Sequence, residues 1–130
     1  MAALFFVDDK DPRPLYQQLA AQVKAQIRKG TLQPGEELPS VRELSSTLGI
    51  NLHTVHHAYR TLREEGIVLL RLGRRPRVAP LHEGPPAPDG LARLRAQLGE
   101  LVTEGFHLGL SPKDFRALVD ELLATDRGKR

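Results

Sequence analysis

The chain has 130 residues, of which 40% are hydrophobic and 27% charged, as in an ordinary globular domain with a small appendage. It contains no cysteine, which excludes disulfides, thiolate metal sites and thiol nucleophiles, and its apolar runs are too short to span a bilayer. We therefore expect a cytoplasmic protein that makes no membrane contact. The net charge is +3, but residues 42–80 carry seven arginines against three glutamates, and this local excess favours a nucleic-acid partner.

The first predicted elements are a short strand and a helix. Residues 4–7, LFFV, are an apolar run that indicates a strand, and DDKDPRP after it indicates a loop. A helix is expected to begin near Pro14, because proline suits the first helical position, and to end at Gly30. Its apolar positions recur at helical spacing: Tyr16, Leu19, Ala20, Val23 and Ile27.

The next two helices are predicted from their caps. Residues 40–43, SVRE, have the pattern of a capping box, in which the Ser40 hydroxyl and the Glu43 carboxylate each accept a hydrogen bond from the other residue's amide. The helix that starts there should end at Gly49, and Asn51 is suited to cap the helix that follows. Two helices joined by a short turn through glycine have the outline of a helix-turn-helix.

A β-hairpin is predicted after the third helix. The runs IVLLRL and RVA flank GRRP at residues 73–76, where Pro76 must sit at a position that needs no ladder hydrogen bond. Three helices followed by a hairpin is the order of a winged helix-turn-helix, so we predict this fold, mainly α with a small β-hairpin, for residues 1–79. Residues 80–90 hold four prolines and two glycines and predict a linker without a regular element.

Residues 91–130 predict two helices that cannot form a core of their own. Apolar residues recur at helical spacing over 91–102 and 115–123. About 40 residues rarely support a core alone, so these faces should pack either on the winged domain or, as the proline-rich linker favours, on the same segment of a second chain. The expected dimerisation residues are Leu94, Leu98, Leu101, Phe115, Leu118 and Leu122.

The helix after Asn51 has two chemically different faces. At 100° per residue, an apolar set falls on one side: Val55, Ala58, Tyr59 and Leu62. The opposite side carries three histidines and an arginine: His53, His56, His57 and Arg60. In a helix-turn-helix the outward face of the second helix enters the DNA major groove, where imidazole can bond a base edge or a phosphate.

Two other interpretations of the histidines stay open. The face could simply be solvated, or His53 and His57, four residues apart, could bind one zinc ion. No acidic residue matches them on this face and the chain has no cysteine, so we expect neither a metal nor a cofactor. The sequence contains no GxSxG, HExxH or phosphate-binding loop and no paired carboxylates in a plausible cleft, and we expect no enzymatic activity.

Residues 14–79 resemble the DNA-binding domain of the GntR family of bacterial transcription regulators. The resemblance lies in PLYQQL at 14–19, GTLQPGEELPSVREL at 30–44 and LREEGIV at 62–68. The opening LFFVDDKDPRP and the short helical tail are similar to the YtrA-like members of the family. The resemblance implies DNA contacts from the first motif helix, the second motif helix and the wing, at Arg42, Asn51, His53, Thr54, His56 and Gly73.

The predicted wing departs from the family pattern. It is written GRRPRV at residues 73–78, where GxGTxV is usual, and places Arg74, Arg75 and Arg77 where they would bind phosphates. The alternative is a hairpin tip whose charges only keep the protein soluble. Similarly, Arg42 could be the structural partner of a carboxylate instead of a DNA contact.

These observations together predict a homodimeric, sequence-specific regulator that binds double-stranded DNA at an inverted-repeat operator. By the family resemblance we expect a repressor. The alternative is a winged helix used for protein–protein interaction. The sequence shows no site for a small-molecule effector.

Overall fold

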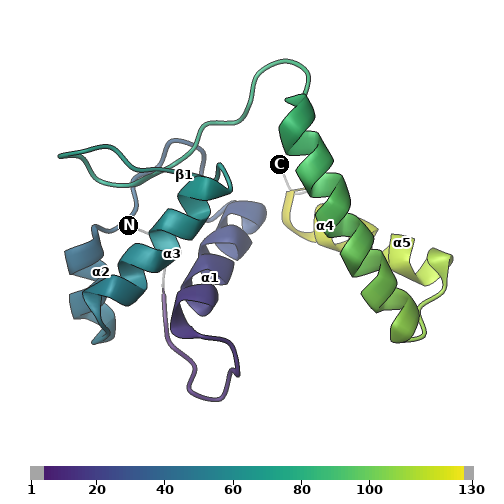
Figure 1. The fold of residues 1–130 in the computed structure, drawn as a ribbon, viewed down its shortest axis with the longest axis horizontal. Helices are drawn as coiled ribbons and strands as arrows, with labels where there is room; N and C mark the ends of the chain where they lie inside the picture. Colours follow the sequence, from purple (N-terminus) through teal and green to yellow (C-terminus); the bar gives the residue numbers. More distant parts are fainter. Residues whose placement is uncertain (1–4, 128–130) are drawn as a thin grey trace. The chain divides into compact units, whose positions relative to one another are not determined.

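The computed structural model describes residues 5–127, with side chains as far as residue 124. The chain forms two compact units, one ending at Leu81 and the other beginning at His82. In the described residues, the first unit holds three helices and a two-stranded antiparallel sheet, and the second holds two helices (Figure 1).

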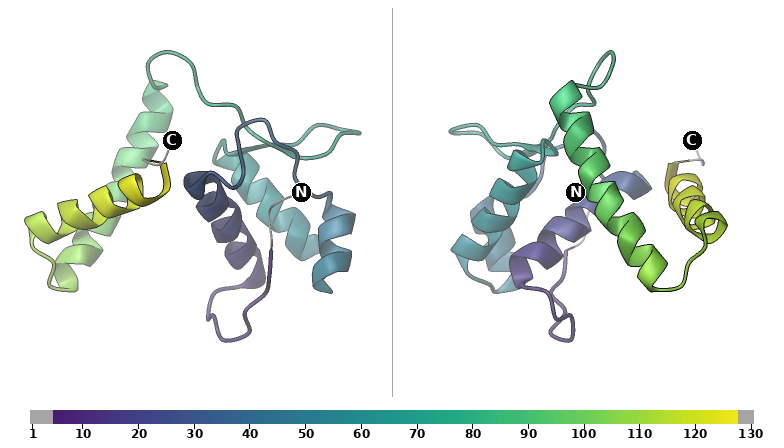
Figure 2. Two further views of the ribbon diagram at one scale, coloured as in Figure 1. Left: turned by 180° about the vertical axis from the view of Figure 1, so that it is seen from behind. Right: turned by 45° about the vertical axis from the view of Figure 1, so that its right-hand side comes forward.

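The first unit is built around its third helix. Helix α3 (Leu52–Glu64) packs against both α1 (Leu15–Lys29) and α2 (Val41–Leu48), and α1 lies beside it in every view (Figures 1 and 2). Each helix turns one apolar stripe inward, as its periodicity predicts. The buried core draws on all three helices, the segment between α1 and α2, and the hairpin: Leu19, Ala20, Val23, Leu32, Leu38, Leu44, Val55, Ala58, Tyr59, Leu62, Val68 and Val78.

The predicted caps of α2 and α3 are confirmed. The Glu43 amide donates to the Ser40 hydroxyl at 3.1 Å, and the Ser40 amide donates to the Glu43 carboxylate at 2.9 Å. The His53 amide donates to the Asn51 side chain at 2.7 Å, so Asn51 caps α3. Gly49, with φ of 67°, ends α2 in the left-handed conformation that favours glycine. These caps fix where both helices of the motif begin.

The strand predicted at residues 4–7 is wrong for its described part, residues 5–7, while Leu4 lies outside the described residues. The backbone of Phe6 pairs with a side chain instead of a strand. Its amide donates to Gln22 Oε1 at 3.1 Å, and Gln22 Nε2 donates to its carbonyl at 2.6 Å. A primary amide offers the same donor and acceptor as a backbone peptide group, so α1 itself satisfies this segment.

The hairpin consists of β1 (Val68–Leu69) and β2 (Arg77–Val78), and we call residues 68–78 the wing. The segment 35–38 runs beside β2 and exchanges three backbone hydrogen bonds of 2.8–2.9 Å with residues 76 and 78. Pro76 is buried immediately before β2, where its carbonyl accepts one of these bonds and no amide is required. The wing is therefore attached to the domain along its return strand.

The second unit contains α4 (Pro88–His107) and α5 (Pro112–Arg127). Helix α4 starts three residues earlier than the linker prediction allows, so that prediction is wrong for residues 88–90. The reason is local, because proline at the first helical position and Asp89 in the first turn both favour a helix start. The two helices touch where buried Gly105 faces the ring of Phe115.

The apolar faces of α4 and α5 remain open within this chain. Leu94, Leu98 and Leu101 are 58%, 46% and 53% exposed, and Leu118 and Leu122 are 42% and 44% exposed. A stripe of large apolar side chains at helical spacing is a surface that soluble proteins normally cover. No helix in the described part of the chain is both long and apolar enough to cross a membrane.

Candidate nucleic-acid interface

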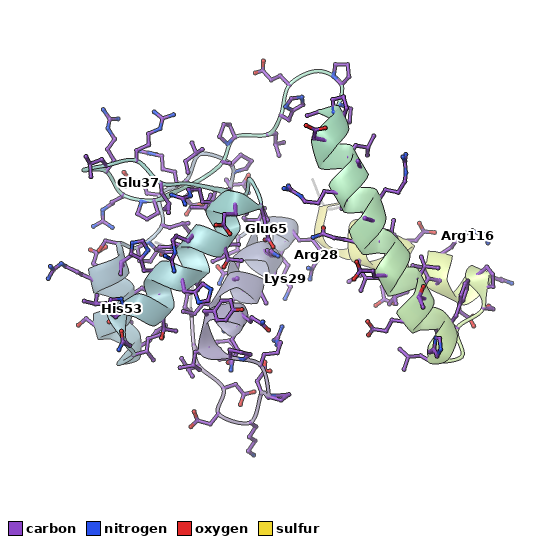
Figure 3. All side chains as sticks on the ribbon, viewed as in Figure 1. Arg28, Lys29, Glu37, His53, Glu65 and Arg116 are labelled. Atoms are coloured by element: carbon purple, nitrogen blue, oxygen red, sulfur yellow. The ribbon has the colours of Figure 1, made fainter. Side chains whose placement is uncertain are left out.

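The outward face of α3 is fixed by the side chains buried behind it. Four residues hold its inner face and are at most 1% exposed, which confirms the predicted core face: Val55, Ala58, Tyr59 and Leu62. Because the two faces of a helix point in opposite directions, His53, His56 and Arg60 are exposed on the far side (His53 is labelled in Figure 3). The structure thus presents two imidazoles and a guanidinium on one solvent-facing surface.

A hydrogen bond ties α3 to the chain just before α2. The hydroxyl of Tyr59 donates to the carbonyl oxygen of Pro39 at 2.6 Å. Burial raises the pKa of the Tyr59 phenol above its ordinary value, so it stays protonated as the donor. The Ser40 cap follows Pro39 directly, and this bond therefore sets the place of the α2 N-terminus relative to α3.

Polar groups predicted to contact DNA cluster at the two helix starts. Arg42 is exposed in the first turn of α2 and has no ion-pair partner among the described residues, so the structure assigns it no carboxylate. Asn51 uses its side-chain oxygen for the α3 cap, which leaves its side-chain amide nitrogen to donate. Thr54 is partly exposed in the first turn of α3. These positions stay predictions as DNA contacts.

The structure places His57 differently from the other two histidines. Its ring stacks on that of Tyr16 in α1, with the ring centroids 3.7 Å apart and the planes 12° from parallel. His57 lies on the edge of the outward face nearest α1, and the helical wheel cannot show that α1 runs alongside. His57 is nevertheless exposed like His53 and His56, so its predicted DNA contact stays a prediction, and its ring also contacts α1.

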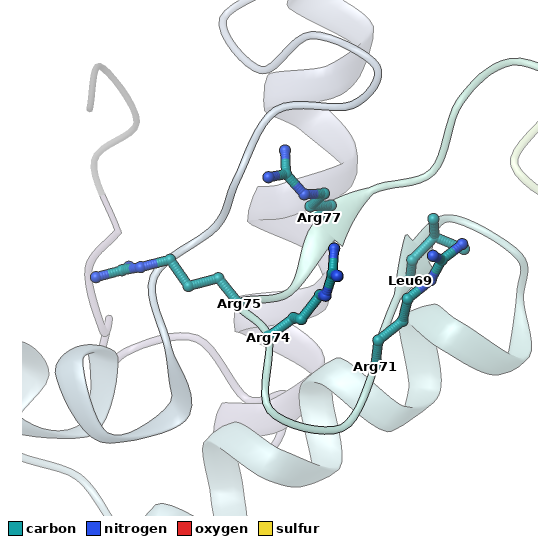
Figure 4. A pocket seen from close by; sticks show the side chains of 5 residues that line it. All are labelled: Leu69, Arg71, Arg74, Arg75 and Arg77. Carbon is teal, nitrogen blue, oxygen red and sulfur yellow. The ribbon is translucent and has the colours of Figure 1, made fainter.

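The wing arginines fall into two groups. Arg75 donates from Nη1 and Nη2 to the Glu43 carboxylate at 2.5 and 2.7 Å, and Arg77 pairs with Glu37 at 2.9 Å. Arg71 and Arg74 are exposed, and neither has an ion-pair partner in the described part of the chain. Figure 4 shows Arg75 extending away from Arg71 and Arg74. The GRRPRV motif does not indicate this division among Arg74, Arg75 and Arg77.

Arg63 and Arg71 also line the interface. A hollow of about 380 Å³ separates α3 from the wing and is lined in part by His56, Arg63, Arg71 and Arg74. Arg63 stands seven residues after His56, two helical turns along the same face, so the wheel contains the signal for it. Arg71 lies two residues before the GRRPRV motif, in a run of four arginines within seven residues, and the turn closed by the Arg74 amide and the Arg71 carbonyl keeps it beside Arg74. A smaller hollow of about 140 Å³ is lined by Leu69 and four arginines (Figure 4).

The electrostatics of the wing attachment follow from its hydrogen bonds. The Arg75 guanidinium, and next the Ser40 amide, lower the pKa of Glu43 to about 2. Glu43 is therefore ionised at every pH at which DNA binding is measured.

Among the described residues, no three His, Asp or Glu side chains gather in a way that could hold a metal ion.

Comparison with known proteins identifies the family. The sequence profile of the bacterial regulatory proteins of the gntR family matches residues 15–78. The structure of YtrA from Sulfolobus acidocaldarius, a GntR-family transcription factor, is similar with a TM-score of 0.62 and 30% identity, over 91% of this chain and 95% of that one. The chain belongs to the GntR family. Its members are DNA-binding transcription regulators and not enzymes.

Similarity to known proteins extends to a whole repressor chain and to a DNA-binding domain solved with its operator. The transcriptional repressor YtrA of Bacillus subtilis is 29% identical over 122 residues, which is 94% of each chain. The AraR DNA-binding domain, solved with operator ORX1, has a TM-score of 0.53 and 25% identity, and covers 58% of this chain and 96% of its own. The protein is thus a GntR-type DNA-binding regulator with a winged helix-turn-helix.

Proposed function

We propose that the protein is a homodimeric repressor that recognises an inverted-repeat operator with α3 in the major groove. The observation that supports it most directly is the outward face of α3, where His53, His56 and Arg60 stay exposed because four buried residues hold the helix from behind. Imidazole and guanidinium can both bond base edges. As a regulator of transcription, the protein would act in the cytoplasm.

Contacts to the DNA backbone come from the groups around this face. The side chains of Arg42, Asn51 and Thr54 stand at helix starts, where free backbone amides also favour a phosphate. Arg71 and Arg74 extend the positive surface along the wing, and Gly73, with φ of 75°, forms its tip. Together these groups support binding in which base contacts select the sequence and arginines supply much of the affinity.

The tail supports the dimer. The open leucines of α4 and α5 lie at helical spacing, and a second copy of the same segment offers a matching apolar surface. Phe115 stays a predicted dimer residue, and its ring also faces Gly105 in its own chain. Repressors of this kind bind as dimers when two recognition helices are held about one helical turn of DNA apart. The similarity to the repressor YtrA supports repression in place of activation.

The DNA-binding proposal is tested by selecting bound fragments from random duplex DNA with the full chain. We expect an inverted repeat whose half-sites are about 10 base pairs apart, centre to centre. Transcription from a promoter carrying the selected sequence should fall when the protein is added. Selection that enriches no sequence would refute operator recognition.

The dimer is tested by a charge placed in the apolar stripe. Leu98→Glu should shift the protein to monomer in sedimentation velocity and weaken binding to the two-half-site operator. Leu81→Glu is the matched control, because Leu81 is 63% exposed but lies outside both tail helices. A Leu98→Glu protein that stays dimeric would place the interface elsewhere.

A further inference from the structure

We propose that Arg75 is a positioning residue: paired with Glu43, it fixes the wing to the N-terminus of α2 and so sets where Arg71 and Arg74 meet DNA. The inference rests on the proposed function. It gives Arg75 a role different from the phosphate contact expected from the sequence.

The wing has few restraints of its own. Its strands β1 and β2 have two residues each, and a hairpin this short does not hold its shape alone in water. Its turn is closed by a backbone hydrogen bond from the Arg74 amide to the Arg71 carbonyl at 3.1 Å. The segment 35–38 anchors the return strand only as far as Pro76. The position of the tip therefore depends on what holds the next residue, which is Arg75.

Arg75 is held from two directions at once. Both of its terminal nitrogens donate to the two carboxylate oxygens of Glu43, a geometry that fixes orientation as well as distance. Glu43 is itself held, because the same carboxylate accepts from the Ser40 amide and closes the α2 cap. The wing is thus joined to the capped N-terminus of α2.

The Arg75–Glu43 pair also makes the wing arginines differ in how freely each can bind a DNA phosphate. A phosphate that took over both Nη donors of Arg75 would have to displace the Glu43 carboxylate. Arg71 and Arg74 have no carboxylate to displace among the described residues, so they can bind a phosphate directly. The expected division of labour is that Arg71 and Arg74 touch DNA and Arg75 places them.

Four variants of the full chain test this role on the selected operator: Arg75→Ala, Glu43→Gln, the two combined, and Arg74→Ala as control. Glutamine at position 43 keeps the capping pattern of α2. Arg75→Ala and Glu43→Gln should each weaken binding about two- to fivefold, as removal of an exposed ion pair does, and the combination should be no weaker than either alone. The two single variants should change the salt dependence of affinity to the same extent, because each releases Arg71 and Arg74 in the same way. Arg74→Ala should reduce the slope of log K against log salt by about 0.9 for each phosphate that the variant no longer neutralises.

Two binding results would overturn the inference. If Glu43→Gln tightens binding, Glu43 only competes with phosphate for Arg75. If Arg75→Ala flattens the salt dependence and Glu43→Gln does not, Arg75 itself binds a phosphate.

A measurement without DNA separates this inference from the proposed function. In the free protein, hydrogen exchange of the amides of residues 70–75 should speed up in Arg75→Ala and Glu43→Gln but not in Arg74→Ala. Unchanged exchange in all variants would show that the pair does not hold the wing. If the unaltered protein selects no DNA sequence, the proposed function is overturned and the positioning role with it. If the unaltered protein selects a sequence but the variants do not show the expected changes, only the positioning inference is overturned.

Discussion

The contact between α4 and α5 predicts opposite effects of one substitution at two glycines. A Cβ added at Gly105 would lie 2.7 and 2.8 Å from two ring carbons of Phe115, far closer than carbon atoms pack. A Cβ added at Gly99 would meet no atom within 4 Å. Both glycines lie in α4, so the difference between them isolates the packing against α5.

The magnitudes follow from these distances. Overpacking at Gly105 costs about 1–3 kcal/mol, and the better helix propensity of alanine offsets about 1 kcal/mol of it. Gly99→Ala should stabilise the protein by the difference in helix propensity alone, because the new methyl group meets no neighbouring atom. The free energies of unfolding of the two variants should therefore differ by about 1–3 kcal/mol, with Gly105→Ala the less stable.

Urea unfolding followed by circular dichroism measures this difference. It is recorded at several protein concentrations, because the stability of a dimer depends on concentration. Adding Phe115→Leu to Gly105→Ala should recover stability, since the smaller side chain makes room for the new methyl group. Equal stability of Gly105→Ala and Gly99→Ala would show that α4 and α5 do not meet at this contact. If Gly99→Ala weakens dimerisation and does not raise stability, a helix of the partner chain packs against position 99.

Three other predictions concern the DNA-binding unit. Tyr59→Phe should lower the free energy of unfolding by about 0.5–1.5 kcal/mol, because it removes the hydrogen bond to the Pro39 carbonyl. Because burial raises the pKa of Tyr59, the unaltered protein should also lose stability as pH rises above about 10, and the variant should lose less. Urea titrations measure both effects. Because the folded pKa of Glu43 lies near 2 against an ordinary 4.5, its contribution is complete above about pH 4.5 and is lost as pH falls toward 2; Glu43→Gln should flatten thermal stability over that window. His56→Ala should change the bases selected from random DNA, whereas His57→Ala should leave them unchanged; altered selection by His57→Ala would return that residue to the recognition surface.

Much of the fold could be predicted because it is decided by neighbours in the sequence. The Ser40 and Asn51 caps join residues two or three positions apart, and the inner face of α3 follows from spacing along a single helix. Local rules also explain the early start of α4 at Pro88, although the linker prediction gave its prolines too much weight. The strand expected before Asp8 was wrong, since its backbone partner is a side chain of α1.

The sequence by itself therefore determined that the protein is a winged helix-turn-helix regulator, with His53, His56, His57 and Arg60 on the exposed side of its third helix. Only the tertiary structure decided which polar groups are already engaged. His57 stacks on Tyr16 from another helix, and Arg75 and Arg77 reach carboxylates 32 and 40 residues away. The physical reason is range: periodicity and capping act within a few residues, whereas a side chain's partner across the fold depends on how whole elements pack.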